Sequence, residues 1–138
     1  MFFLDANILL EVMLNQKQAD ECANFLQKLE KGPPICYLTD FLLYSMLLTI
    51  LRYESPGIAK KFLSIISSYE RILIYRPTLL DLDTTLSTMP LLNLDFDDAM
   101  VVTIMQQTGL DTVVSFDHHF DSIAQINRME PKEAQSLL

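Results

Sequence analysis

The sequence predicts an α/β protein built on a central, mostly parallel sheet of four to five short strands. Short continuous apolar runs alternate along the chain with segments whose apolar residues recur at helical spacing. Continuous apolar runs are typical of parallel strands that are covered on both faces. The alternation of strands and helices indicates strand–helix–strand units with right-handed crossovers.

Local patterns define each predicted element. Thr39 or Asp40 caps a very apolar helix, Ser55-Pro56 opens the next helix, and Gly109 closes a later one. Asn7 is expected to cap the first helix. The predicted elements are, in chain order, a strand at 2–4, helices over 8–14 and 17–30, a strand at 35–38, helices over 40–51 and 56–69, a strand at 72–75, helices over 78–88 and 95–107, a strand at 112–115 and a last short strand near 128–129.

Length and composition indicate one ordinary folded domain over residues 1–138. Hydrophobic residues make up 50% of the chain and charged residues 20%, which excludes intrinsic disorder and a coiled coil. Two cysteines are too few for a disulfide scaffold. The longest apolar stretch, 41–51, is too short to span a bilayer, and the N-terminus lacks the basic region of a signal peptide. We therefore expect a reduced, cytoplasmic protein without a membrane association.

The net charge of the chain argues against one class of nucleic-acid-binding protein. Ten Lys and Arg residues face eighteen Asp and Glu residues, a formal net charge of −8. This balance argues against a protein that holds nucleic acid through a basic surface. It still allows an enzyme that meets phosphate groups through cations bound to carboxylates.

Acidic residues gather where a parallel sheet places its ligand site. Asp5 and Asp117 each follow an apolar strand, and Asp95, Asp97 and Asp98 crowd the first turn of the helix over 95–107. Ligands of such sheets lie beyond the carboxyl ends of the strands. Asp5, Asp98 and Asp117 are therefore expected to converge, although Asp95 and Asp97, taken alone, are more typical of helix caps.

Three carboxylates in one cleft repel one another unless they are protonated or bridged by a cation. An all-oxygen ligand set favours Mg²⁺ or Mn²⁺ over zinc. Such ions can orient a water molecule and neutralise a phosphodiester as charge develops.

Three segments carry a resemblance to a known family. Residues 3–7, Phe-Leu-Asp-Ala-Asn, resemble the first motif of PIN domains, an apolar strand followed by Asp-x-Asn. Residues 94–102 resemble the Asp-Ala helix start of that family, and residues 113–121 resemble its final motif of strand, Ser or Thr, Asp and a nearby Phe. The order and spacing of these motifs match along nearly the whole chain.

The resemblance implies a three-layer α/β/α sandwich and a Mg²⁺- or Mn²⁺-dependent ribonuclease of the VapC toxin type, acting on RNA. Asp5, Asp98 and Asp117 map onto the metal-binding catalytic acids of the family, and Asn7 and Ser115 map onto the polar positions that support them. The family also implies a homodimer, and its toxin members bind an antitoxin.

One position departs from the family pattern. PIN domains usually carry a Glu in the helix after the second strand, and Ser45 stands at that position here. Asp95, which shares a helix face with Asp98, is a better substitute ligand than Glu11. Two functions therefore stay open: a nuclease, and a catalytically weak or degenerate module that acts through protein or RNA binding. A phosphotransfer domain is disfavoured because Asp5 has no second acid two residues on and no Lys lies within 111–121.

Two further features have no assigned role. His118 and His119 lack partners at zinc-ligand spacing and are expected on a surface loop or short helix. The helix over 40–51 is apolar nearly all round, which predicts either a helix buried within the domain or one that meets another subunit or a partner.

Overall fold

A five-stranded parallel sheet in the order β3-β2-β1-β4-β5 forms the centre of the molecule. This arrangement comes from a computed structural model that describes all residues, 1–138. The strands are β1 (Phe2–Leu4), β2 (Cys36–Thr39), β3 (Ile72–Tyr75), β4 (Thr112–Val114) and β5 (Asn127–Met129). The predicted parallel sheet is confirmed, including its short last strand. Because the strand order reverses direction between β1 and β4, a crevice is expected at the carboxyl ends of these two strands.

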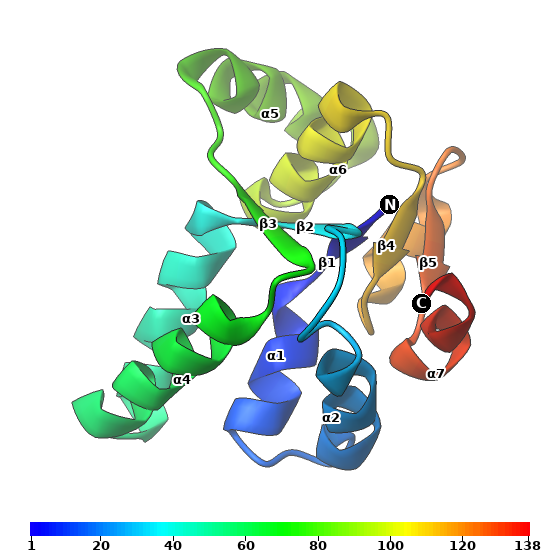
Figure 1. Cartoon of the computed structure of the whole chain (residues 1–138). Helices are drawn as coiled ribbons and strands as arrows, with labels where there is room; N and C mark the ends of the chain where they lie inside the picture. The colour runs from blue at the N-terminus through cyan, green and yellow to red at the C-terminus, as the bar shows by residue number, and fades with distance from the viewer.

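Helices cover both faces of the sheet, as the sandwich architecture requires. Figure 1 shows α5 and α6 together on one face, and α1, α2, α3 and α4 on the other. The longest helices have 14 residues, and no helix combines the length and apolar character needed to cross a bilayer. The helices are α1 (Ala6–Met13), α2 (Ala19–Gln27), α3 (Asp40–Tyr53), α4 (Pro56–Ser68), α5 (Leu79–Leu92), α6 (Phe96–Thr108) and α7 (Pro131–Ala134), with two 3₁₀ turns, η1 (His118–Ser122) and η2 (Gln135–Leu137).

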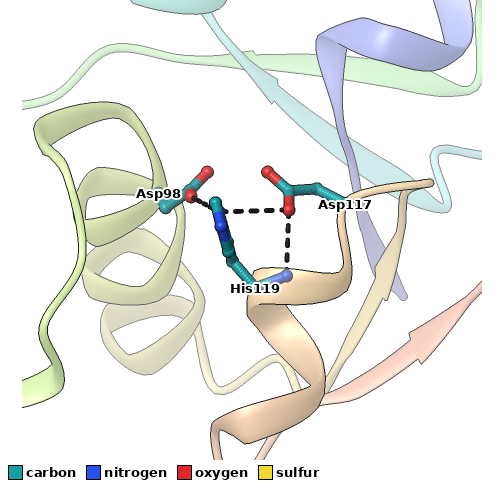
Figure 2. Close-up of side chains that lie close together, drawn as sticks. All are labelled: Asp98, Asp117 and His119. Carbon is teal, nitrogen blue, oxygen red and sulfur yellow. Dashed lines mark hydrogen bonds and ion pairs between the residues drawn. The ribbon is translucent and has the colours of Figure 1, made fainter.

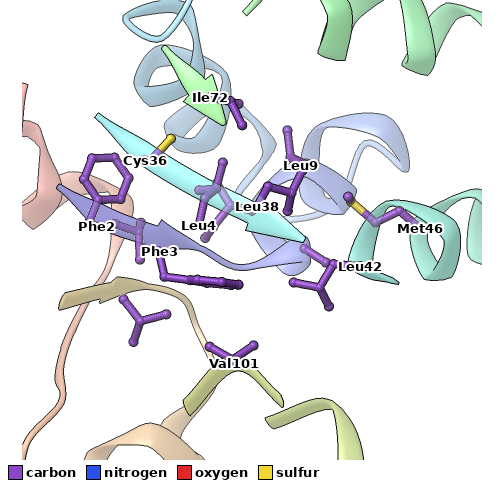
Figure 3. Close-up of a cluster of buried hydrophobic side chains, with 14 of the residues drawn as sticks. Phe2, Phe3, Leu4, Leu9, Cys36, Leu38, Leu42, Met46, Ile72 and Val101 are labelled. Carbon is purple, nitrogen blue, oxygen red and sulfur yellow. The ribbon is translucent and has the colours of Figure 1, made fainter. Parts of the chain in front are cut away.

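The hydrophobic core lies on both sides of β1, the central strand. Phe2, Phe3 and Leu4 are all buried, and successive residues of a strand point to opposite faces. Phe2 packs against Phe25 of α2, with ring centroids 6.0 Å apart, and Phe3 extends toward Val101 of α6 (Figure 3). A central strand packed on both sides holds its carboxyl end, and therefore Asp5, in a fixed place.

Capping residues explain where several helices begin and where α6 ends. The Thr39 side chain accepts the Leu42 N–H at 3.2 Å, Ser55 caps α4, and Gly109 closes α6 at a φ of +70°, which a residue without Cβ adopts at no steric cost. The prediction that Asn7 caps α1 is wrong, because Asp5 occupies the N-cap position. The predicted end of α5 at residue 88 is also wrong, since α5 continues through Pro90 to Leu92. Proline removes only one helical hydrogen bond, and α5 packs along α6.

Candidate metal centre

The carboxyl ends of β1 and β4 bring two predicted site segments together. Leu4 of β1 pairs with Val114 of β4, so the residues that follow, Asp5 and Ser115, also lie side by side. The Asp5 N–H donates to the Val114 carbonyl at 3.1 Å, which continues the ladder by one bond. Segments that are 110 residues apart in sequence therefore meet at the point where the strand order reverses.

Ser115 links the side chains at this point. Its fully buried hydroxyl donates to Asp5 Oδ2 at 2.5 Å and accepts the Asp117 N–H at 2.9 Å. Asn7 Nδ2 donates to the same Asp5 oxygen at 3.0 Å and to Ser115 Oγ at 3.1 Å. These bonds hold one oxygen of Asp5 in place and orient the backbone that leads into Asp117.

Three side chains meet beside Asp5. Asp98 from the first turn of α6, Asp117 from the end of the β4 segment and His119 from η1 point toward one another (Figure 2). His119 Nδ1 lies 3.1 Å from Asp98 Oδ2 and 3.2 Å from Asp117 Oδ1. One potential ligand atom from each residue lies within 4.8 Å of the other two.

The electrostatics of the site favour a cation. Burial, with the Asp98 and Asp117 charges adding to it, raises the pKa of Asp5 to about 6, although the Ser115 hydroxyl and the Ala6 N–H lower it. Burial and the Asp117 charge raise the pKa of Asp98, and the hydrogen bond to Asp98 raises the pKa of His119. No Lys or Arg forms an ion pair with any of these aspartates. His119 is the only basic side chain that compensates their charge.

The other predicted ligands have different places. Asp95 is the exposed N-cap of α6, and its Oδ1 accepts the Asp98 N–H at 3.1 Å, so it positions the start of the helix. Glu11 accepts the Gln18 N–H at 2.8 Å and holds the connection between α1 and α2. Ser45 lies one helical turn before Thr49 of α3. Thr49 and Asn7 line the same surface hollow between α1 and α3.

Sequence reasoning missed His119. Adjacent histidines predicted a surface position, and the His119 side chain is indeed 71% exposed, but its ring turns back toward Asp98 and Asp117. The local signal is the two-residue spacing from Asp117, whose Oδ1 accepts the His119 N–H at 2.9 Å as the cap of η1. Its proximity to Asp98, 21 residues away, depends on how α6 packs on the sheet beside the segment that carries η1.

The donor set suits a divalent cation. Two carboxylates and an imidazole are ordinary metal ligands, and close carboxylates without a Lys or Arg partner are stabilised by a bound ion. Asp98, Asp117 and His119 are the residues placed to hold such an ion. Asp5 lies beside them and adds negative charge, but its carboxylate is not one of the three groups that meet within 4.8 Å.

The comparisons with known proteins identify the family of this chain. The family profile of the PIN domain matches residues 2–126, so this chain belongs to the PIN domain family. The predicted family is thereby confirmed. No curated protein sequence matches the chain significantly.

The fold is shared with VapC toxin structures. The Mycobacterium tuberculosis VapC20, a toxin that cleaves the sarcin–ricin loop, superposes with a TM-score of 0.71 at 14% identity, covering 91% of this chain and 97% of that one. The Rickettsia felis VapBC2 complex, bound to a promoter DNA fragment, gives 0.71 at 15% identity over 94% and 97% of the two chains. A Klebsiella pneumoniae toxin–antitoxin complex gives 0.69 at 16% identity over 95% and 98%.

Proposed function

We propose that this protein is a metal-dependent endoribonuclease that hydrolyses RNA phosphodiester bonds, and the toxin of a toxin–antitoxin pair. One observation carries the proposal: Asp98 and Asp117 converge beside Asp5 at the carboxyl edge of the sheet without any Lys or Arg partner. Membership of the PIN family and the likeness to VapC toxin structures support the same activity.

The side chains of the site have separate tasks in this proposal. Asp98 and Asp117, together with His119, hold a divalent cation, and Asp5 adds negative charge beside it. A cation held there would supply Lewis-acid chemistry toward a phosphodiester and toward a bound water molecule. Ser115 and Asn7 fix Asp5, while the Asp95 cap fixes the first turn of α6. A net charge of −8 predicts that RNA binding depends on the cation rather than on a basic surface.

Ser45 supports a second candidate function. It brings no charge to the side of α3 where PIN domains usually carry a Glu, and the cluster of Asp98, Asp117 and His119 includes neither Asp95 nor Glu11, whose carboxylates accept backbone N–H groups. The alternative is a catalytically weak module that binds RNA or a protein. The two functions differ in whether the metal-loaded protein cleaves RNA.

Partners are proposed from exposed apolar faces. On α3, Leu42, Met46 and Ile50 are buried, whereas Tyr44 and Leu48 are 56% and 72% exposed, so the helix is not enclosed by the domain. Leu79 and Leu91 of α5 are 86% and 80% exposed. Such faces are typical of protein interfaces. They support a homodimer and an antitoxin partner, and a toxin–antitoxin complex is among the structures that share the fold.

The whole chain is proposed to act as one domain in the cytoplasm. The family match ends at residue 126, but β5 pairs with β4 and α7 packs against α2, so the last residues complete the same sheet and helix layer. Cys22 and Cys36 are both free and buried, which suits a reducing compartment.

RNA cleavage with and without Mn²⁺ tests the activity. The expected result is Mn²⁺-dependent cleavage by the wild type, and a loss of at least a hundredfold in Asp98→Asn. Asp83→Asn is the matched control, because Asp83 is an exposed aspartate of α5 outside the site, and it should cleave like the wild type. Mn²⁺ binding without cleavage would favour the binding module, and cleavage by Asp98→Asn at the wild-type rate would refute the proposed site.

A further inference from the structure

We infer that the centre selects a first-row transition-metal ion that accepts an imidazole nitrogen, such as Co²⁺ or Zn²⁺, strongly over Mg²⁺, and that His119 Nδ1 is the selecting ligand. This inference rests on the metal centre of the proposed function and differs from the all-oxygen ligand set predicted from the sequence. The observation is the single nitrogen that faces two carboxylate oxygens, at 3.1 Å from Asp98 and 3.2 Å from Asp117.

The spacing of these atoms suits ligands of one ion. Transition-metal bonds to imidazole and carboxylate are about 2.0–2.2 Å long, so neighbouring ligand atoms around one ion lie about 3–3.5 Å apart. The distances from His119 Nδ1 to both oxygens already fall in this range. Two of the three ligand pairs therefore already have the spacing of ligands around one ion, and the third pair, between Asp98 and Asp117, lies within 4.8 Å.

The His119 ring is available to an ion. The only hydrogen-bond and ion-pair partners of the ring are Asp98 and Asp117, and the side chain is mostly exposed on a short 3₁₀ helix. The adjacent His118 differs, because its Nδ1 lies 2.8 Å from Asp121 and 3.1 Å from Arg128. His118 therefore provides a matched control histidine next to the site.

The ligand chemistry separates the two kinds of ion. Mg²⁺ prefers octahedral oxygen ligands, whereas imidazole suits transition metals. Asp98 and Asp117 each offer a carboxylate oxygen, and His119 adds one nitrogen to them. This nitrogen shifts the preference of the site from Mg²⁺ toward transition metals.

Calorimetric titrations with Co²⁺ and with Mg²⁺ test this selectivity through the ratio of the two dissociation constants. Transition metals bind most sites more tightly than Mg²⁺, so the change of the ratio on mutation is the decisive quantity. His119→Asp replaces the nitrogen by an oxygen ligand, and we expect it to lower the Mg²⁺/Co²⁺ ratio of dissociation constants at least tenfold. His118→Asp should leave the ratio as in the wild type. The visible absorption of the Co²⁺ complex should change in His119→Asp and not in His118→Asp.

The outcomes separate this inference from the proposed function. Equal ratios in the wild type and His119→Asp, with both ions bound, would overturn the role of His119 and leave the metal centre in place. Failure of both ions to bind either protein would overturn the metal centre as well. Melting in chelator verifies that each variant is folded, and His119→Gln, which removes the nitrogen without adding charge, provides the same comparison for Co²⁺ if His119→Asp does not fold.

Discussion

Asp5→Asn should stabilise the metal-free protein at neutral pH, although it removes a carboxylate from the candidate site. The cause is the burial of Asp5, which raises its pKa from 3.8 to about 6, with the Asp98 and Asp117 charges adding to the effect. Asparagine has nearly the same shape, and its side-chain oxygen can still accept hydrogen bonds from Ser115 and Asn7. The variant therefore removes the buried charge while it keeps those two contacts.

The sign and size of the effect follow from proton linkage. Between pH 3.8 and about 6 the folded wild type holds a proton on Asp5 that the unfolded chain has lost. The contribution of this group to stability is therefore present in full below pH 3.8 and is lost as the pH rises through about 6. The difference of about two pKa units corresponds to about 3 kcal/mol. Relative to the wild type, Asp5→Asn should gain this amount between pH 4 and pH 7.5, which is about 10 °C in Tm.

Urea unfolding in chelator at several pH values measures the difference. At pH 4 position 5 is largely uncharged in both folded proteins, so any difference there reports the amide contacts rather than the charge. Asp83→Asn, which neutralises an exposed aspartate, should not show the same gain. The difference in unfolding free energy between the wild type and Asp5→Asn should grow from pH 4 to pH 7.5. A difference that stays constant over this range would refute the argument that the buried charge of Asp5 lowers stability.

Three further predictions concern the metal and its supports. Mn²⁺ at a hundredfold excess over its Kd should stabilise the wild type by about 2.7 kcal/mol, which is several degrees in a thermal melt. Asp98→Asn should lose most of this gain in stability. An unchanged gain in that variant would mean that the ion binds elsewhere. Ser45→Glu should be less stable than the wild type in chelator, because the added carboxylate is costly to bury without an ion. The same carboxylate should make Mn²⁺ binding tighter in a calorimetric titration. Equal Mn²⁺ affinities would mean that this side of α3 does not face the ion. The Arg128 guanidinium donates twice to Asp121, at 2.8 and 3.4 Å, and these contacts hold η1 against β5. Arg128→Lys loses this pair of contacts, so the Mn²⁺ affinity should fall severalfold. Arg71 is a matched control, because its guanidinium donates to the Pro33 and Lys28 carbonyls and not to any residue of the site. Arg71→Lys should lower stability without that loss of affinity, and equal Mn²⁺ affinities in the two variants would remove Arg128 from the support of the site.

The donor set of the candidate site affects which metal ion should be used to assay the protein. The chain has the PIN fold, Ser45 where the family usually carries a Glu, and an imidazole beside the two carboxylates of the candidate site. The proposed centre therefore combines a family scaffold with a donor set that includes a nitrogen. Measuring metal preference before RNA cleavage avoids assaying the enzyme with an ion that it does not hold.

Local patterns in the sequence determined the order of strands and helices. Phe2-Phe3-Leu4 is apolar and short enough to form only a buried strand, and Thr39, Ser55 and Gly109 end or begin helices through bonds to residues a few positions away. These effects act within one turn, so they can be read without the fold. The rule that parallel strands meet at one edge was enough to bring Asp5, Asp98 and Asp117 into one neighbourhood.

Only the tertiary structure decided which atoms meet there. Asn7 does not cap α1, because its amide reaches Ser115, 108 residues away, and α5 passes through Pro90 because it is held against α6. His119 turns toward Asp98 because the packing of α6 on the sheet places the only basic side chain of the site beside two carboxylates. Each of these contacts joins segments far apart in sequence, and the energy of burying and pairing a charge depends on neighbours that no local pattern specifies.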